Sequence, residues 1–207
     1  MGALFSRRRY HVVILGLDAA GKSTVLFQLR FRQYVSTTPT IGFNYERLRL
    51  DAVSGATFDV WDVGGQDKVR PLWRSYTRTT DGILFVVDSS DVERLEEAKV
   101  ELLRTARTPE TLGVPMAVLA NKNDLPASRS SEEIHRQLGL ADVLAGRLWS
   151  IHSACAVTGE GLDEAVVQLH AMIVKRRKST SKRWTRRPVS QRLCDVYSRS
   201  SVTLSLD

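Results

Sequence analysis

The chain has 207 residues, of which 43% are apolar and 26% are charged. This balance is typical of a soluble globular protein, and the length favours one domain with tails over two domains. No apolar run approaches the roughly 20 residues that cross a bilayer, and the start lacks the apolar core of a secretory signal. The two cysteines, Cys155 and Cys194, do not suggest a disulfide framework, so we expect an intracellular protein.

The net charge of +7 comes from one segment of the chain. Lys175–Arg187 holds eight basic residues and no acidic one; removing these eight from the 30 basic residues leaves 22 against 23 acidic ones. The sequence therefore predicts a basic appendage on a nearly neutral domain.

Short apolar runs alternate with helical patterns along the chain. This alternation predicts an α/β fold, with a mostly parallel six-stranded sheet and helices on both faces. Two of the strands are expected to form a hairpin that turns at Val53–Ala56, around Gly55. The predicted strands are His11–Leu15, Asn44–Leu50, Thr57–Trp61, Gly82–Val87, Val114–Ala120 and Trp149–Ala154.

Helices are predicted between these strands. Ser130 and Glu133 have the spacing of a capping box for one of them. The apolar pattern stops after Arg177, and a chain rich in Ser and Arg follows, which we expect to be largely disordered. The predicted organisation is an anchor segment 1–10, a nucleotide-binding domain 11–177 and a basic tail 178–207. The predicted helices are Gly21 to about Gln33, Asp91–Arg107, Ser131–Leu138 and Gly161–Lys175.

A glycine-containing loop follows the first predicted strand and opens the first helix. Gly16–Ser23 fits the pattern GxxxxGK[ST] in the setting that a phosphate-binding loop requires. Its backbone N–H groups and the helix N-terminus favour a β-phosphate, Lys22 adds a positive charge, and the Ser23 hydroxyl suits Mg²⁺. A chance turn is the alternative, and the motif alone leaves kinases, ATPases and GTPases open. The expected contacts are Asp18, Ala19, Ala20, Gly21, Lys22, Ser23 and Thr24.

The choice of base is indicated by Asn121-Lys122-Asn-Asp124 at the carboxyl end of an apolar strand. The Asp124 carboxylate can accept from the ring N–H and the amino group of guanine, a donor pair that adenine lacks. Asn121 and Lys122 are expected to brace this loop. A polar turn is the alternative for the tetrapeptide alone. Ser153–Ala156 resembles the GTPase segment whose backbone N–H groups, here those of Cys155 and Ala156, read the guanine O6.

Two further segments predict a site that senses the γ-phosphate. Asp62 can hold Mg²⁺ through water, the N–H of Gly65 can contact the γ-phosphate, and Gln66 can orient the attacking water. Thr40 can complete the Mg²⁺ ligands beside Ser23 only when that phosphate is present. Loss of one phosphate would then release both loops.

No arginine is placed to neutralise transition-state charge within the chain. We therefore expect slow intrinsic hydrolysis, which an arginine finger of a partner raises by roughly 10³–10⁵-fold.

The motifs GLDAAGKS, PTIGF, WDVGGQDKVRPLW, NKND and CAVTGEGL resemble the Arf-like small GTPases in order and spacing, over about Val12 to Lys175. The stretch RPLWRSYTRTTDGILFVVDSSDVERLEEAK is most similar to the subgroup numbered four. The resemblance implies GTP or GDP with Mg²⁺, a monomer, an exchange factor, a GTPase-activating protein and effectors. It also implies that Phe43, Trp61 and Tyr76 form the surface that effectors read; the alternative is half-buried sheet aromatics.

Both ends of the chain carry membrane signals. Met1–Ser6 fits the myristoylation pattern, with Gly2 as the modified residue. One such chain binds weakly, so a second signal is expected from Arg7–Arg9 or from anionic lipids at Lys175–Arg187. The cytoplasmic face of a membrane, plasma membrane or endomembrane, is the expected location. Alternatives for the basic block are a solvated tail and a nuclear import signal; no element for direct nucleic-acid binding accompanies it.

The start of the chain departs from the Arf pattern. Only about eight residues separate Gly2 from the first predicted strand, too few for the amphipathic helix that Arf proteins usually release with GTP. We expect membrane binding in both nucleotide states. A second hypothesis for the whole protein is a nucleotide-stabilised membrane scaffold with little turnover, against which the presence of Gln66 argues.

Overall fold

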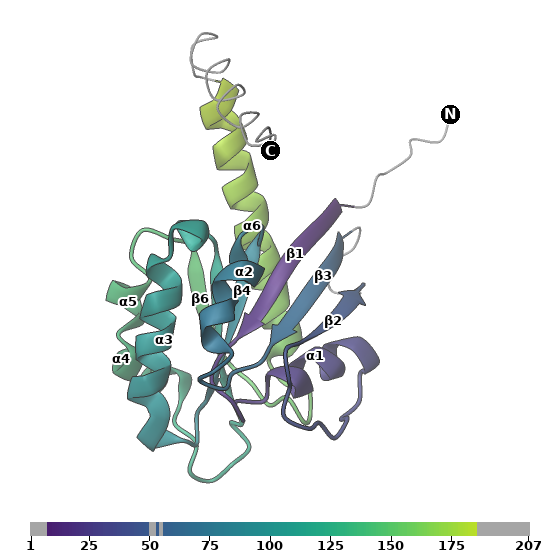
Figure 1. Cartoon of the computed structure of the whole chain (residues 1–207), viewed down its shortest axis with the longest axis vertical. Helices are drawn as coiled ribbons and strands as arrows, with labels where there is room; N and C mark the ends of the chain where they lie inside the picture. Colours follow the sequence, from purple (N-terminus) through teal and green to yellow (C-terminus); the bar gives the residue numbers. More distant parts are fainter. Residues whose placement is uncertain (1–7, 50–52, 54–55, 186–207) are drawn as a thin grey trace, which may run out of the picture. The chain divides into compact units, whose positions relative to one another are not determined.

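A computed structural model describes residues 8–49, 53 and 56–185, with side chains described as far as residue 180. Six strands form one sheet in the order β2-β3-β1-β4-β5-β6 (Figure 1). Neighbouring strands run parallel except β2 and β3, which form an antiparallel hairpin. The mostly parallel six-stranded sheet is therefore confirmed. The strands are β1 (Arg8–Leu15), β2 (Phe43–Leu48), β3 (Ala56–Val63), β4 (Gly82–Asp88), β5 (Met116–Asn121) and β6 (Trp149–Ser153).

Helices cover both faces of this sheet (Figure 1). Successive strand residues point to opposite faces, so Val13 and Leu15 of β1 join a core with α2, α3, α4 and α5, while the buried Val12 and Ile14 point to the other face of the sheet. Three short 3₁₀ turns lie at Arg70–Leu72, Val92–Arg94 and Pro109–Thr111. The helices are α1 (Lys22–Phe31), α2 (Trp73–Thr77), α3 (Leu95–Arg107), α4 (Ser131–Leu138), α5 (Leu140–Val143) and α6 (Leu162–Thr185).

The central strands β4 and β5 are buried almost completely. Helices on both faces explain why their sequences are continuous apolar runs rather than alternating ones. Gly82 opens β4 because a Cβ there would lie 2.8 Å from Ile173 Cδ1 and 3.0 Å from Leu169 Cδ1 of α6. Since β3, β1, β4, β5 and β6 pair in parallel, their carboxyl ends lie at the same edge of the sheet, where the loops that carry the polar motifs emerge.

The last helix is longer than the sequence predicted. It continues to Thr185, ten residues beyond Lys175, so the prediction of disorder from residue 178 is wrong as far as residue 185. Lys and Arg are good helix formers even where the apolar pattern has stopped, and the Thr180 hydroxyl donates to the carbonyls of Arg176 and Arg177. Residues 186–207 lie outside the described part of the chain.

Smaller differences occur at other elements. β1 begins at Arg8 rather than His11, the helix predicted from Asp91 begins as a 3₁₀ turn, and the short helices α2 and α5 had no sequence signal. The capping box of α4 is confirmed, since the Ser130 hydroxyl accepts from Glu133 N–H and the Glu133 carboxylate accepts from Ser130 N–H. The predicted hairpin turn lies partly outside the described residues.

The chain divides into two compact units, Met1–Ile173 and Val174–Asp207, and α6 runs from the first into the second. Among the helices that the structure describes, none has the length and apolar character needed to cross a membrane.

Candidate functional site

The phosphate-binding loop joins β1 to α1. Ala19 and Gly21 adopt positive φ values of 59° and 91°, and Gly21 caps α1, so the loop turns sharply into the helix. Lys22 is 6% exposed, and its Nζ donates to the Leu17 carbonyl at 2.7 Å. Burial lowers the pKa of Lys22 to about 8, against the opposing attraction of Asp62 and Asp18. A phosphate beside this ammonium would restore its positive charge.

A cavity of about 390 Å³ opens over this loop. Gly65 and Gln66 reach it from the segment after β3, and Thr40 reaches it from the segment before β2. The structure therefore brings together the phosphate loop and both predicted switch segments. The predicted site residues that line the cavity are Asp18, Ala19, Gly21, Lys22, Ser23, Thr24, Thr40, Gly65, Gln66 and Lys122.

Three predicted magnesium-related side chains meet at the edge of the cavity. The Ser23 hydroxyl donates to Asp62 Oδ2 at 2.5 Å and lies 2.8 Å from the Thr40 hydroxyl. Asn44, which the sequence reading missed, donates to Asp62 Oδ2 at 2.9 Å and to Thr40 Oγ1 at 3.3 Å. The second oxygen, Asp62 Oδ1, is buried and accepts no hydrogen bond from the described residues. Two hydroxyls and an unpaired carboxylate oxygen are the ligand chemistry of a hard cation such as Mg²⁺.

A second cavity of about 200 Å³ shares Gly21, Thr24 and Lys122 with the first. Asp124 lines it and is exposed, as the prediction for a base-reading carboxylate requires. Three residues that the sequence did not indicate also line this cavity, and their side chains supply apolar or aromatic surface for a flat base: Tyr34, Leu125 and Val157.

Asn121 ties three loops together. It is 1% exposed, its Nδ2 donates to the Ala20 carbonyl at 2.8 Å, and its Oδ1 accepts from the Ala156 N–H at 2.9 Å. The phosphate loop is thus connected directly to the two loops at the second cavity. This agrees with the predicted bracing role of Asn121 and explains why an amide, with a donor and an acceptor, is needed there.

Lys122 has an ion-pair partner that the sequence reading missed. Its Nζ lies 2.6 Å from Asp88 Oδ2 at the end of β4, and its backbone has a φ of 65°. Burial alone would raise the pKa of Asp88, but hydrogen bonds from Lys122 and Ser90 outweigh it and keep that pKa low. The pair fixes the lysine stem along the wall that the two cavities share.

Cys155 does not line either cavity. It is 1% exposed, and its N–H donates to the Glu160 carbonyl at 3.1 Å, so the donor predicted to read a base is turned into its own loop. Ala156 does line the second cavity, although its N–H is already bonded to Asn121. Loop geometry of this kind has no signal in the sequence.

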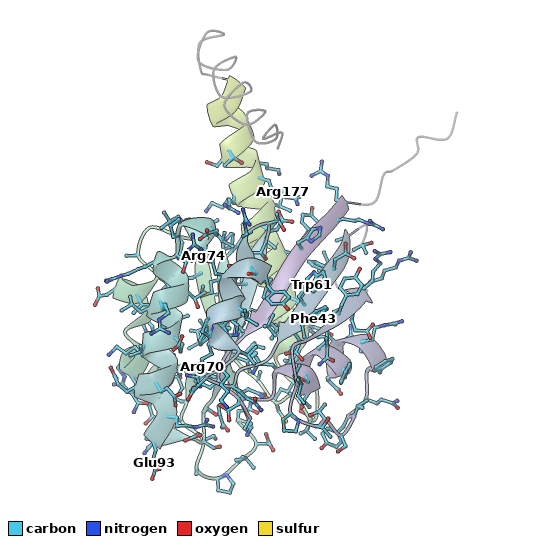
Figure 2. The ribbon with its side chains drawn as sticks, in the orientation of Figure 1. Phe43, Trp61, Arg70, Arg74, Glu93 and Arg177 are labelled. Carbon is cyan, nitrogen blue, oxygen red and sulfur yellow. The ribbon has the colours of Figure 1, made fainter. Side chains whose placement is uncertain are left out.

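Three predicted surface aromatics lie together on β2, β3 and α2. The ring centres of Phe43 and Trp61 are 5.0 Å apart, and Tyr76 lies 5.5 Å from Phe43 and 6.2 Å from Trp61. Figure 2 shows Phe43 beside Trp61 on neighbouring strands. Trp61 and Tyr76 are half-buried against the core, whereas Phe43 is 46% exposed. Tyr45, 4.9 Å from Trp61, extends this group.

The predicted membrane signals lie mainly outside the residues that the structure describes. Gly2, the predicted lipidation site, is outside them. Lys175–Thr185 belongs to α6, within the second unit.

Comparison with known proteins identifies the family. The ADP-ribosylation factor family profile matches residues 1–173. The mouse ADP-ribosylation factor-like protein 4A is 51% identical over 180 residues, which cover 86% of this chain and 90% of that protein. The human ADP-ribosylation factor-like protein 4C is 52% identical over 171 residues, covering 82% and 89%. The structure of the Arl6 BBS3 small GTPase from Trypanosoma brucei, with the nucleotide analogue GppNp bound, superposes with a TM-score of 0.74 at 29% identity, covering 81% of this chain and 99% of that one. The chain belongs to the ADP-ribosylation factor family of small GTPases, which bind and hydrolyse GTP, and it matches the Arf-like subgroup numbered four.

Proposed function

We propose that this GTPase is a switch that recruits effectors at a membrane when it is loaded with GTP. The observation that carries the proposal is the meeting of Ser23, Asp62 and Thr40 within hydrogen-bond distance. Ser23 closes the phosphate loop, Thr40 lies in the segment before β2, and Asp62 lies at the end of β3, directly before the segment that reaches the larger cavity. A ligand that engages one of them necessarily affects the other two.

Mg²⁺ fits this cluster. The hydroxyls of Ser23 and Thr40 would be direct ligands, and the unpaired Asp62 Oδ1 would hold the ion through water. When bound, the ion would neutralise the charge on the β- and γ-phosphate oxygens. Asn44 would keep the Asp62 carboxylate in place through its hydrogen bond.

The base end supports guanine as the ligand. Asp124 would accept from the ring N–H and the amino group, and the Ala156 N–H, shared with Asn121, would donate to the O6. The remaining contacts to the phosphates would come from the loop residues that line the larger cavity and from Ala20, whose carbonyl is held by Asn121.

Hydrolysis would depend on Gln66, which lines the larger cavity and would orient the attacking water. The residues lining that cavity include no arginine. Nearby, Arg70 and Arg94 are engaged with carboxylates. These observations support slow intrinsic hydrolysis, raised roughly 10³–10⁵-fold by the arginine of an activating protein.

Two substitutions test the switch. Ser23→Asn removes a Mg²⁺ ligand and should weaken GTP more than GDP binding, whereas unchanged GTP affinity would count against Ser23 as a ligand. Gln66→Leu should abolish hydrolysis stimulated by a GTPase-activating protein while GTP binding persists. Stimulated turnover that survives in Gln66→Leu would remove Gln66 from the mechanism. Failure of the wild type to turn over with any activating protein would favour the alternative, a nucleotide-stabilised scaffold.

Partner binding is proposed at the aromatic surface of Phe43, Trp61 and Tyr76. It lies on β2, β3 and α2, beside the segments that carry Thr40 and Gln66, so it would report the bound nucleotide. Comparing proteins captured by Gln66→Leu and by Ser23→Asn tests this. A Phe43→Ala substitution in the Gln66→Leu background should lose the GTP-dependent partners, and their retention would place effectors elsewhere.

Membrane attachment is proposed through myristoylated Gly2 together with the basic segment Lys175–Arg187. We expect it in both nucleotide states, at the cytoplasmic face of a membrane. Gly2→Ala should move the protein to the soluble fraction, and an unaltered membrane fraction would mean that the basic segments suffice. The alternative role of the basic segment is nuclear import. A truncated protein of residues 1–173 lacks this segment, and its location in the cell distinguishes the two roles.

A further inference from the structure

Two glycines and Gln66 form the backbone that approaches the larger cavity after β3. This stretch belongs to no helix or strand, and glycine leaves its own backbone angles unrestricted. The Gly64 N–H donates to the Gly42 carbonyl at 2.9 Å, which anchors only the start of the stretch. The orientation of the next two peptide groups must therefore be set by other contacts.

The first of these peptide groups is held by Trp73. Its Nε1 donates to the Gly64 carbonyl at 2.9 Å. Trp73 is 5% exposed and packs edge-on against Phe85 of β4, with the ring centres 6.4 Å apart. The indole is fixed by the core, so the carbonyl that it contacts is fixed as well.

The second peptide group is held by Arg70. Its Nε donates to the Gly65 carbonyl at 2.7 Å, and its side chain is 7% exposed. The guanidinium is oriented in turn by four carboxylates from three elements. Their distances from Arg70 nitrogens are 2.7 Å for Glu97, 2.8 Å for Asp67, 3.6 Å for Asp18 and 3.7 Å for Glu101.

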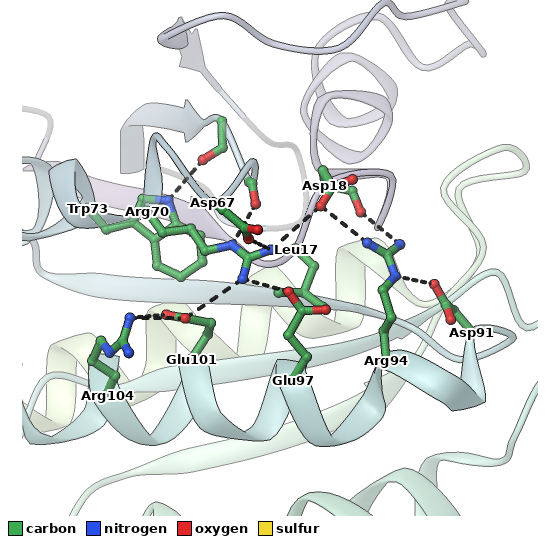
Figure 3. Close-up of polar contacts among 12 residues, drawn as sticks. Leu17, Asp18, Asp67, Arg70, Trp73, Asp91, Arg94, Glu97, Glu101 and Arg104 are labelled. Carbon is green, nitrogen blue, oxygen red and sulfur yellow. Dashed lines mark hydrogen bonds and ion pairs between the residues drawn. The ribbon is translucent and has the colours of Figure 1, made fainter.

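This arrangement joins the switch segment to rigid parts of the fold. Glu97 and Glu101 belong to α3, and Asp18 belongs to the phosphate loop. Arg94 also bonds to Asp18, at 3.2 Å from its carboxylate and 3.3 Å from its carbonyl, so the loop is braced against the turn before α3 (Figure 3). Arg70 is therefore held in a frame built from the phosphate loop and α3.

We propose that Trp73 and Arg70 are positioning residues for the GTPase reaction, one for each of two successive peptide groups. A peptide group is planar, so fixing its carbonyl also fixes the N–H on its other side. Trp73 holds the Gly64 carbonyl and thereby directs the Gly65 N–H, the proposed γ-phosphate contact. Arg70 holds the Gly65 carbonyl and thereby directs the backbone of Gln66, the proposed catalytic residue. The inference rests on the proposed roles of Gly65 and Gln66.

The two positions should separate in their effects. Arg70→Met cannot donate to the Gly65 carbonyl, so single-turnover GTP hydrolysis should fall about tenfold while the ratio of GTP to GDP affinity stays within about threefold. Trp73→Phe retains a ring without the N–H and should lower the GTP-to-GDP affinity ratio about tenfold. A merely structural role for either residue would lower thermal stability without this split.

Matched controls exist for both substitutions. Arg74→Met removes an arginine of α2 that pairs with Glu110 at 2.8 Å; within the part of the chain that the structure describes, its side chain does not bond to the Gly64–Gln66 backbone. Phe58→Leu removes a buried ring that packs with Tyr10 and His170, outside the core cluster around Trp73. Both controls should leave hydrolysis and the affinity ratio at the wild-type level. Equal effects in the controls would overturn the proposal.

The buried charges need a separate variant. Arg70→Met removes a positive charge from beside the buried Glu101 carboxylate, and this loss destabilises the fold by itself. Arg70→Met combined with Glu101→Met removes both charges. Hydrolysis that stays about tenfold low in this double variant supports positioning, whereas recovery to the wild-type rate overturns it.

Gln66→Leu, run in the same assay, separates the positioning role of Arg70 from the catalytic role of Gln66. If it abolishes hydrolysis while Arg70→Met does not slow it, the positioning inference fails and the proposed function stands. If Gln66→Leu hydrolyses GTP normally, the catalytic assignment fails, and the positioning inference for Arg70 fails with it.

Discussion

Gly65 has no room for a side chain, and this gives a sharp test of the switch. A Cβ on Gly65 would lie 2.5 Å from the Gly16 carbonyl oxygen and closer still to the Leu17 and Asp18 backbone. Ordinary contact needs about 3.4 Å. The shortest of these contacts, 2.4 Å to the Asp18 nitrogen, must lengthen by about 1 Å, so the Gly65→Ala substitution must move the segment by that amount from the phosphate loop. Gly65 is not among the described residues with positive φ, so the effect would come from this clash and not from backbone strain.

A shift of this size would break the proposed hydrogen bond from the Gly65 N–H to the γ-phosphate. A hydrogen bond to a charged group contributes about 1.5–3 kcal/mol, so GTP affinity should fall roughly ten- to a hundredfold. GDP lacks that phosphate, and its affinity should change less than about threefold.

The assay is displacement of a fluorescent GDP analogue, with Mg²⁺, by GDP and by a non-hydrolysable GTP analogue. Gly113→Ala is the matched control, because Gly113 has a φ of +68° but nothing within 4 Å of a Cβ. It should lower stability by about 1–2 kcal/mol without changing either affinity. An unaltered ratio of GTP to GDP affinity in Gly65→Ala would refute the reasoning.

Three further outcomes are expected. Asp124→Asn replaces one acceptor oxygen of the carboxylate by a donor NH₂ group, so the binding preference should move from guanosine towards xanthosine nucleotides. Competition binding measures this preference, and an undiminished preference for guanosine would contradict the role of Asp124. Burial lowers the pKa of Lys22 to about 8, so part of the ligand-free protein is uncharged there in mildly basic solution. GDP should restore the charge and take up protons in this range, so GDP affinity should weaken as the pH rises above the Lys22 pKa. Calorimetry in two buffers measures the uptake, and its absence, or the same value in Lys22→Met, would contradict it. Ser130→Ala removes the N-cap of α4 and should lower the free energy of unfolding by about 1 kcal/mol, which thermal melts measure. GDP affinity should stay unchanged, and a loss of GDP affinity would mean that α4 contributes to the nucleotide site.

The sheet was predictable because its strands carry strong local patterns. β4 and β5 are continuous apolar runs, and the P-loop and NKND motifs mark the carboxyl ends of β1 and β5. The end of α6 was not predictable from apolar spacing, since basic residues, which have good helix propensity, continue the helix to Thr185 beyond the last apolar positions. The short helix α2 depends on contacts of Trp73 with the core, which are distant in sequence.

The residues of the candidate site also fall into those that the sequence predicts and those that it does not. Residues within contiguous motifs, such as Lys22, Asp62 and Asn121, were found because one short segment carries the whole signal. Asp88 and Arg70 were missed because their partners lie 34 residues away in Lys122 and 27 residues away in Glu97. Cys155 was predicted to read the base, but its N–H turns to Glu160, a detail of loop geometry.

The central claim is that the γ-phosphate fixes Thr40 and Gly65 in place. Amide hydrogen exchange of residues 37–42 and 62–72, with Mg²⁺ and either GDP or a non-hydrolysable GTP analogue, measures this directly. The GTP analogue should slow exchange in both segments together and leave β4 and β5 unchanged. Equal exchange in the two nucleotide states, or protection of one segment without the other, would contradict the account.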